Sequence, residues 1–203
     1  MKACFTFLSV LLTAGSLQAS LQELPCRAPQ QHIIEDHAAR SVYKNCKRNG
    51  MTWWYNDKGG IKSKVNFKNG KEEGVYTSYH DNGKVKLTVN YTNGQKNGIQ
   101  YIYYDNGQLG SRVNYVNGRR EGLMTEWDYT GYKSSEVFYK HNYKVGLKKY
   151  YDKHGKVIMT ETYKMDRNPV MVRYLKNKRK EIEIDLVKYG LIPEKKPDTA
   201  IKH

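Results

Sequence analysis

A period of 24 residues constrains this chain more than any other feature of its sequence. Val75 to Gly98 (VYTSYHDNGKVKLTVNYTNGQKNG) recurs, with substitutions but without insertions, on both sides of itself. The five copies are residues 51–74, 75–98, 99–122, 123–146 and 147–170. Such a period is typical of repeat proteins, in which each copy forms one supersecondary unit and neighbouring copies stack.

Aromatic residues and glycines keep the same phase in every copy, numbered here as positions 1 to 24. Position 9 is glycine and position 17 is aromatic in all five copies, and position 15 is valine in the first four. Position 5 is also aromatic throughout, and we predict that it belongs to the buried core. On that assignment, Tyr103→Ala would cost roughly 3 to 5 kcal/mol.

Each copy has the pattern of one β-hairpin. Positions 1 to 6 are rich in aromatic and β-branched residues, and a turn signal such as Asp81-Asn-Gly83 follows. Apolar and polar residues then alternate from Val85 to Tyr91, which indicates a strand with one face in water. A lone hairpin cannot bury its apolar face. The sequence therefore predicts an all-β fold, an elongated solenoid of stacked antiparallel β-hairpins that advances roughly 10 Å per copy.

The glycine and aromatic spacing resembles that of the MORN repeat. It is seen in Tyr115 to Gly122 (YVNGRREG), which Gly131 follows nine residues later. The ordinary MORN repeat has another glycine two residues after position 24, where this chain has Tyr76, Gln100 and Met124. In that departure the chain is similar to the bacterial MORN-variant repeat, often named an antitoxin component. The resemblance covers about residues 43–170. It implies a protein-interaction or phospholipid-binding module without catalytic residues of its own.

Residues 1–19 have the features of a secretory signal peptide. Lys2 gives a basic start, residues 4–14 are apolar, and Ser16 to Ala19 offers a small-residue cleavage site. The apolar run is too short to span a bilayer, and an N-terminal anchor or a buried strand is the alternative. We therefore expect residues 1–19 to be removed and the chain to be exported to the periplasm or the extracellular space.

Removal of residues 1–19 would leave two cysteines, Cys26 and Cys46. In an oxidising compartment such a pair predicts one disulfide, worth roughly 3 kcal/mol by chain entropy. A metal-binding or nucleophilic pair is the alternative, and it needs further ligands that the sequence does not place. We assign residues 20–50 to an N-terminal cap with half a repeat. Within it, residues 30–42 are expected to form a short helix or an irregular segment over the edge of the first hairpin.

The repeat pattern weakens after residue 147. Position 15 becomes Glu161 and position 24 becomes Val170, as expected of a terminal capping copy. We assign residues 51–170 to five repeats and residues 171–190 to a C-terminal cap, in which the alternating Lys180–Val187 predicts a last strand. Residues 191–203, with Pro193, Pro197 and several lysines, are expected to be a disordered tail.

No set of catalytic or metal-binding residues recurs in the frame of the repeats. His32 to His37 (HIIEDH) matches neither H-E-x-x-H nor H-x-x-E-H, so the zinc-ligand spacing is absent. Turn chemistry explains Asp57, Asp81 and Asp105. We expect no enzymatic activity, no metal site and no cofactor.

Positive charge is the remaining feature. Without residues 1–19 the chain carries 34 basic and 20 acidic residues. This balance favours acidic partners such as anionic lipid or another envelope polyanion, although solubility alone also explains it. Nucleic acid is not an expected partner, because base-reading motifs are absent and export argues against it.

In a hairpin stack, the turns at positions 18–23 share one rim, which is the candidate site for a polyanion or a partner. This rim carries nine basic residues against four acidic ones, whereas the rim formed by positions 6–10 carries five aspartates against four lysines. Lysines that only decorate solvent-facing turns are the alternative. The nine are Lys68, Lys71, Lys96, Arg119, Arg120, Lys140, Lys144, Lys164 and Arg167.

Two functional hypotheses follow. The first is a non-enzymatic, exported module that binds another protein across its extended sheet, with Trp54, Tyr76 and Tyr104 as exposed aromatics. The family name adds the idea of an antitoxin or immunity-like factor. The second is a peripheral binder of an anionic membrane surface or another polyanion.

Overall fold

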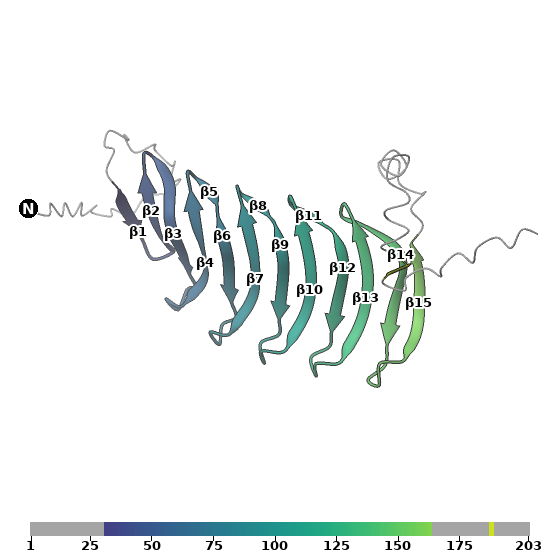
Figure 1. Cartoon of the computed structure of the whole chain (residues 1–203). Helices are drawn as coiled ribbons and strands as arrows, with labels where there is room; N and C mark the ends of the chain where they lie inside the picture. Colours follow the sequence, from purple (N-terminus) through teal and green to yellow (C-terminus); the bar gives the residue numbers. More distant parts are fainter. Residues whose placement is uncertain (1–30, 164–186, 189–203) are drawn as a thin grey trace, which may run out of the picture.

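Hairpins follow one another along a single antiparallel sheet in the computed structural model, which describes residues 31–163 and 187–188 (Figure 1). The sheet has 15 strands, and its main path runs β1-β2-β3-β4-β6-β7-β9-β10-β12-β13-β14-β15, in chain order. The two-residue strands β5, β8 and β11 pair beside this path with β4, β7 and β10. The predicted all-β, elongated stack of hairpins is confirmed.

The strand bounds follow the 24-residue period. The first three strands are β1 (His32–Glu35), β2 (Ala39–Lys44) and β3 (Lys47–Tyr55). The other strands of the first three copies are β4 (Ile61–Lys68), β5 (Lys71–Glu72), β6 (Gly74–Tyr79), β7 (Val85–Thr92), β8 (Gln95–Lys96), β9 (Gly98–Tyr103), β10 (Leu109–Val116) and β11 (Arg119–Arg120). The last strands are β12 (Gly122–Trp127), β13 (Lys133–Lys140), β14 (Tyr143–Tyr151) and β15 (Val157–Tyr163).

Two kinds of turn connect the strands, and each kind lies along its own rim of the sheet (Figure 1). At one rim, two residues have positive φ, as at Asn69 (53°) and Gly70 (82°). This turn matches the right-handed twist of the flanking strands. We call it the Asn-Gly rim, with turns at residues 45–46, 69–70, 93–94, 117–118 and 141–142. We call the other the Asp rim, with turns at residues 56–60, 80–84, 104–108, 128–132 and 152–156.

The core is a line of valines on one face of the sheet. The position-15 side chains Val65, Val89, Val113 and Val137 are at most 2% exposed. Residues at positions 13 and 17 on the same strands point to the same side, because strand side chains alternate. They include Ser63, Phe67, Ser111, Tyr115, Ser135 and Tyr139, all buried. We call this side the valine face.

The prediction that the position-5 aromatics belong to the core is wrong. All five are half-buried, and they lie on the opposite side of the sheet, which we call the open face. The register explains why: Ser78 pairs with Leu87, but Tyr79 pairs with Val85, so Lys86 is skipped in a β-bulge. The extra residue places Val85 and Lys86 on the same side as Tyr79, away from the valines.

The expected helix or irregular segment at residues 30–42 is also wrong, because β1 and β2 form a further hairpin there. Ser41 is 4% exposed and stands 24 residues before Val65, so β2 continues the line of position 15. The carboxylate of Asp36 accepts the N–H groups of Ala38 and Ala39 at 2.8 and 2.7 Å and closes the turn. The sheet therefore begins one hairpin earlier than predicted.

The remaining boundaries lie largely outside the described residues. These are the signal peptide, residues 20–30, residues 164–170 of the fifth copy, and nearly all of the C-terminal cap and tail. Val187 and Lys188 are helical, so the predicted strand at Lys180–Val187 is wrong at its last residue. Within the described ranges, no helix is long and apolar enough to cross a membrane.

Pairing is longer within a hairpin than between hairpins. β6 and β7 share six paired positions, whereas β7 and β9 share two, Leu87 with Ile102 and Thr88 with Tyr101. Rim contacts supply further links between copies. At the Asn-Gly rim the Gly94 N–H donates to the Glu72 carbonyl at 2.9 Å. At the Asp rim, Asn82 and Asn106 donate to main-chain carbonyls of the following turn.

The valine line can be tested with one substitution at two sites. We expect Val113→Ala to lower the free energy of unfolding by roughly 2 to 3 kcal/mol, because it removes buried methyl groups and leaves a cavity. Val75→Ala, at a side chain that is 57% exposed, should change it by less than about 0.5 kcal/mol. Urea titration followed by circular dichroism measures both, and equal effects would contradict the assignment of the core.

Candidate interaction surfaces

A row of half-buried aromatic side chains runs along the open face. Successive members are two strands apart and therefore about 10 Å apart along the sheet. The bulge that turns them to this face recurs, with register shifts at Trp54/Tyr55, Ser78/Tyr79, Glu126/Trp127 and Tyr150/Tyr151. We call Tyr55, Tyr79, Tyr103, Trp127 and Tyr151 the aromatic row.

Basic and aromatic neighbours surround the aromatic row in the first three copies. The Lys64 Nζ atom lies 5.9 Å from the centroid of the Tyr79 ring, a contact that favours a cation against the ring face. Tyr101 stacks against Tyr103, with ring centroids 6.3 Å apart and an interplanar angle of 27°. Arg112, at the position equivalent to Lys64, is exposed.

At its C-terminal end the aromatic row is engaged within the sheet. The Tyr151 hydroxyl donates to the Glu136 carboxylate, and the Lys133 Nζ atom lies 3.8 Å from the Tyr151 ring centroid. Burial, and then the hydrogen bond and negative charge of Glu136, raise the pKa of Tyr151. Lys133 and Glu136 also form an ion pair at 3.2 Å. Among the described residues, no carboxylate accepts a hydrogen bond from the hydroxyl of Tyr55, Tyr79 or Tyr103 in this way.

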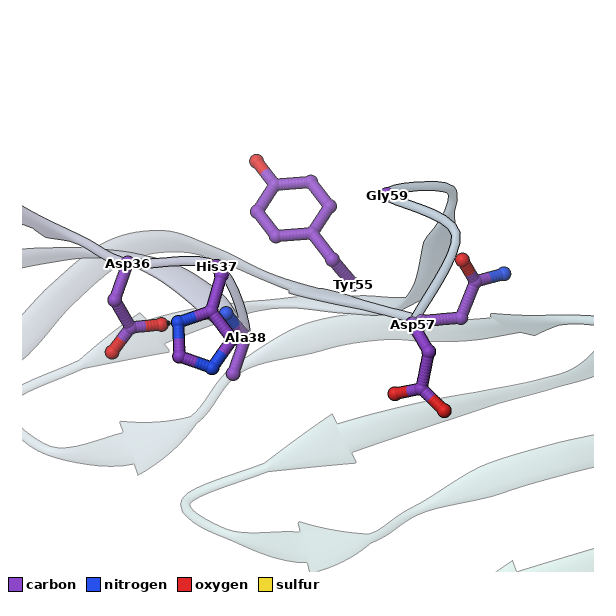
Figure 2. Close-up of a pocket in the computed structure, with 7 residues that line it drawn as sticks. Asp36, His37, Ala38, Tyr55, Asp57 and Gly59 are labelled. Carbon is purple, nitrogen blue, oxygen red and sulfur yellow. Dashed lines mark hydrogen bonds between the residues drawn. The ribbon is translucent and has the colours of Figure 1, made fainter.

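Two hollows at the Asp rim share Tyr55 in their lining. One, of about 510 Å³, lies between the β1–β2 and β3–β4 turns, where Figure 2 shows the Tyr55 ring on the opposite side of the ribbon from His37 and Asp57. The other, of about 350 Å³, lies between the turns of the first and second copies. Its lining includes Tyr55, Tyr79, Lys62 and Lys86.

The predicted basic rim divides into distinct groups. Lys68, Lys71 and Arg119 are exposed at the Asn-Gly rim. Lys140 forms an ion pair with the Glu121 carboxylate. Lys164 and Arg167 lie outside the described residues.

The other three predicted members lie on the valine face, each over the position-17 ring of the following copy. Lys96 lies 5.0 Å from the centroid of Tyr115, Arg120 lies 5.2 Å from Tyr139, and Lys144 lies 4.8 Å from Tyr163. Arg48 lies 5.3 Å from the centroid of Phe67 and extends the series toward the N-terminus. Glu72 stands at the equivalent position between Arg48 and Lys96 and interrupts the series. We call Arg48, Lys96, Arg120 and Lys144 the cation ladder.

Phenol oxygens accept hydrogen bonds from three members of the cation ladder, of which Arg48 donates to Tyr43 at 3.3 Å. Arg120 donates to Tyr139 at 3.2 Å, and Lys144 donates to Tyr163 at 3.1 Å. The hydrogen bond to Tyr115 is the largest influence that raises the pKa of Arg120, and the bond to Tyr163 is the largest that raises the pKa of Lys144. Both side chains therefore stay charged and cover rings of the core, so their first role is structural.

Cys46 is disulfide-bonded. It lies in the β2–β3 turn with φ of 62°, at the position that glycine holds in the turn of the next copy. Cys26 lies outside the described residues, so its pairing with Cys46 stays a prediction. Across the described part of the chain, no three His, Cys, Asp or Glu side chains group closely enough to hold a metal ion.

The aromatics that the sequence suggested for partner binding are engaged elsewhere. Trp54 and Tyr76 lie on the valine face, where they pack against Phe67 and Tyr91. Tyr104 donates its hydroxyl to the Trp127 carbonyl at the Asp rim. The sequence did not lead us to the aromatic row as a surface feature. The signal for it was the extra residue between positions 11 and 13, which shifts the alternation of side chains between the two faces.

Comparisons with known proteins agree with the repeat pattern. A model described as the MORN repeat variant matches residues 72–93, 96–117 and 144–165. No curated protein matches the chain. Among solved structures, a GtfA/B complex bound to UDP and GlcNAc is similar at 11% identity, with a TM-score of 0.24, over 87% of this chain and 31% of that one. A structure of accessory secretory protein 1, 2 and 3 of Streptococcus pneumoniae is similar at 14% identity, with a TM-score of 0.26, over 78% of this chain and 26% of that one. The chain therefore spans less than a third of either relative.

The Asn-Gly rim gives a pH-dependent prediction. Burial opposes ionisation of Glu121, but the hydrogen bonds from Lys140 and the His141 N–H outweigh it, so the pKa of Glu121 is lowered. A lowered pKa stabilises the fold above the ordinary value of 4.5, and this stabilisation is lost as the pH falls below it. We expect Glu121→Gln to cost about 1.5 kcal/mol at neutral pH.

Urea titrations at several pH values measure this difference, which should shrink toward zero as the solution becomes acidic. Glu73→Gln is the matched control, because Glu73 accepts the Asn93 N–H in the equivalent turn at 2.9 Å. A difference between wild type and Glu121→Gln that is independent of pH would contradict the role of the charge.

Proposed function

We propose that this chain, which carries MORN-variant repeats, is a non-enzymatic module that binds another protein through the open face of its sheet. The aromatic row supports the proposal. Tyrosine and tryptophan are enriched at the energetically dominant positions of protein interfaces, because each supplies a large apolar area and a polar atom. Here five of them are half-buried in one line on the open face rather than in the core.

We further propose that the module acts outside the cytoplasm, because residues 1–19 have the pattern of a signal peptide and Cys46 is disulfide-bonded. An antitoxin or immunity-like role would place a toxin or another envelope protein on the open face. An open face that repeats the same aromatic position in every copy suits a partner that covers several copies at once.

The test uses two tyrosines of one strand. Tyr79 lies on the open face, whereas Tyr76 pairs with Val89 on the valine face. We expect Tyr79→Ala to weaken capture of the partner at least tenfold, as for an interfacial hot spot, because it removes an exposed contact. The measurement is affinity capture from an envelope extract, with bound proteins quantified by mass spectrometry.

Tyr76→Ala is the control, and its folded fraction is matched to that of Tyr79→Ala by circular dichroism. Capture should survive this change in proportion to the folded protein present. If both variants lose capture equally at matched folded fraction, or if Tyr79→Ala retains it, the open face is not the binding surface.

A second candidate function is peripheral binding to an anionic membrane surface or another polyanion. The exposed Lys68, Lys71 and Arg119 on one rim favour it, since basic side chains at one edge attract an anionic surface. The cation ladder adds charge on the adjoining valine face, where the side chains are held over aromatic rings.

Paired charge reversal tests this candidate. We expect Lys71→Glu with Arg119→Glu to weaken flotation with anionic vesicles severalfold and to reduce its salt dependence. Lys58→Glu with Lys153→Glu changes two exposed lysines of the Asp rim by the same charge and should have little effect. Equal losses from the two pairs would show that net charge, and not the Asn-Gly rim, attracts the vesicles.

A further inference from the structure

We propose that the aromatic row of the first three copies binds a polyproline II segment of the partner that carries a carboxylate in each turn. This inference rests on the proposed function, because it names the chemistry that the open face would recognise. The site consists of Tyr55, Tyr79 and Tyr103 with the lysines and the arginine beside them.

The spacing of the aromatic row selects among extended ligands. Its members repeat every two strands, at about 9.6 Å. A polyproline II helix presents the same side every three residues, at about 9.3 Å, and so stays in step with the tyrosines. A β-strand presents the same side every two residues, at about 6.6 Å, and falls out of step after one copy.

The hollow between the first two copies offers a place for a proline ring. Tyr55 and Tyr79 both contribute to its lining, and its volume of about 350 Å³ is more than sufficient for a pyrrolidine ring. Polyproline II segments dock on aromatic-lined grooves, and their rigid backbone loses little entropy on binding. One proline per turn would place successive rings between successive tyrosines.

An α-helix is the closest competitor in spacing, since it repeats a side-chain direction every seven residues at about 10.5 Å. A helix is about 10–12 Å wide and must bury the side chains between those repeats. On this face such side chains would lie on top of the tyrosine rings and against Lys62 and Lys86. The thinner polyproline II helix places its intervening residues to the sides of the row.

Charge on the open face indicates the residues between the prolines. Lys62 and Lys86 are exposed and line the hollow. Lys64, on the same strand as Lys62, and Arg112, on β10, occupy equivalent positions that also face this side. In the described part of the chain these four cations have no carboxylate partner within ion-pair distance. A carboxylate in each turn would therefore meet an available cation.

The aspartates of the Asp rim do not reverse this preference. Asp57 and Asp81 also line the hollow, but Figure 2 shows the Asp57 side chain on the opposite side of the ribbon from the Tyr55 ring. In the fourth and fifth copies, Glu136 and Thr160 stand at the position that Lys64 and Arg112 hold in the first and third. The Tyr151 hydroxyl donates a hydrogen bond to Glu136. The site therefore ends near Tyr103, which fits a segment of about nine residues.

The experiment titrates fluorescent peptides with the purified chain and follows anisotropy. The test peptide is built of Pro-Glu-Gln triplets, and its scrambled form has the same composition without the period of three. A third peptide is an amphipathic helix of equal net charge with apolar residues every seven positions. We expect the triplet peptide to bind at least tenfold more tightly than either of the others.

Three variants locate the contact. Tyr79→Ala should weaken binding of the triplet peptide at least tenfold, and Lys86→Glu should weaken it and flatten its salt dependence. Tyr76→Ala, on the other face of the same strand, should leave binding unchanged once the folded fraction is matched. Equal affinity for the triplet and scrambled peptides, preference for the helix, absence of binding, or equal losses from Tyr79→Ala and Tyr76→Ala would each overturn the inference.

The two proposals fail in different ways. If Tyr79→Ala abolishes capture of the native partner but the triplet peptide does not bind, the open face is the binding surface and the polyproline II ligand is wrong. If Tyr79→Ala leaves capture of the partner intact, the proposed function itself fails.

Discussion

Burial within one layer is the constraint on which this structure depends. Residues 31–163 form one sheet and contain no second sheet or helix that could cover it, yet Val65 and Val89 are each 1% exposed. Their cover comes from side chains on the same face, within a copy as with Tyr76 opposite Val89, and between copies as with Ile102 opposite Leu87. A valine in one copy is therefore buried only when its neighbours are in place, and short pairing between hairpins is supplemented by the hydrogen bonds of the two rims.

The two faces of the sheet use their charged and aromatic side chains differently. The cation ladder shows how the valine face uses its charges: Lys96, Arg120 and Lys144 cover rings and are partly withdrawn from solvent. On the open face of the first copies Lys64 lies over the Tyr79 ring, but Lys62 and Lys86 remain exposed beside the aromatic row. The same period thus produces a buried line of valines on one side and a line of half-buried aromatic side chains on the other.

The sequence was sufficient for the repeat, the hairpins and the turns, because these depend on local signals such as Asn-Gly pairs and alternation. It was not sufficient to choose between two aromatic rows. Tyr103 and Tyr115 are equally regular in the sequence, but a bulge of one residue places Tyr103 on the open face while Tyr115 is 8% exposed on the valine face. A single skipped residue reverses the face of every side chain beyond it. The spacing of residues in the sequence does not show which residue the pairing skips. The missed hairpin at β1 and β2 has another cause, since its turn at Asp36 is shorter than the other Asp-rim turns and breaks the frame.

Departures from the repeat carry the functional information that the repeat itself lacks. A perfect array would bind the same group at every step and could not fix where a ligand begins or ends. Here Glu72 interrupts the cation ladder after Arg48, so its contiguous part starts at Lys96. On the other face, Glu136 engages Tyr151 and closes the aromatic row at the C-terminal end. The part of the aromatic row without a carboxylate partner therefore lies toward the N-terminal copies, and the uninterrupted part of the cation ladder lies toward the C-terminal ones. Because of this offset, the aromatic row and the cation ladder form two chemically different surfaces that lie largely on different strands of one short array.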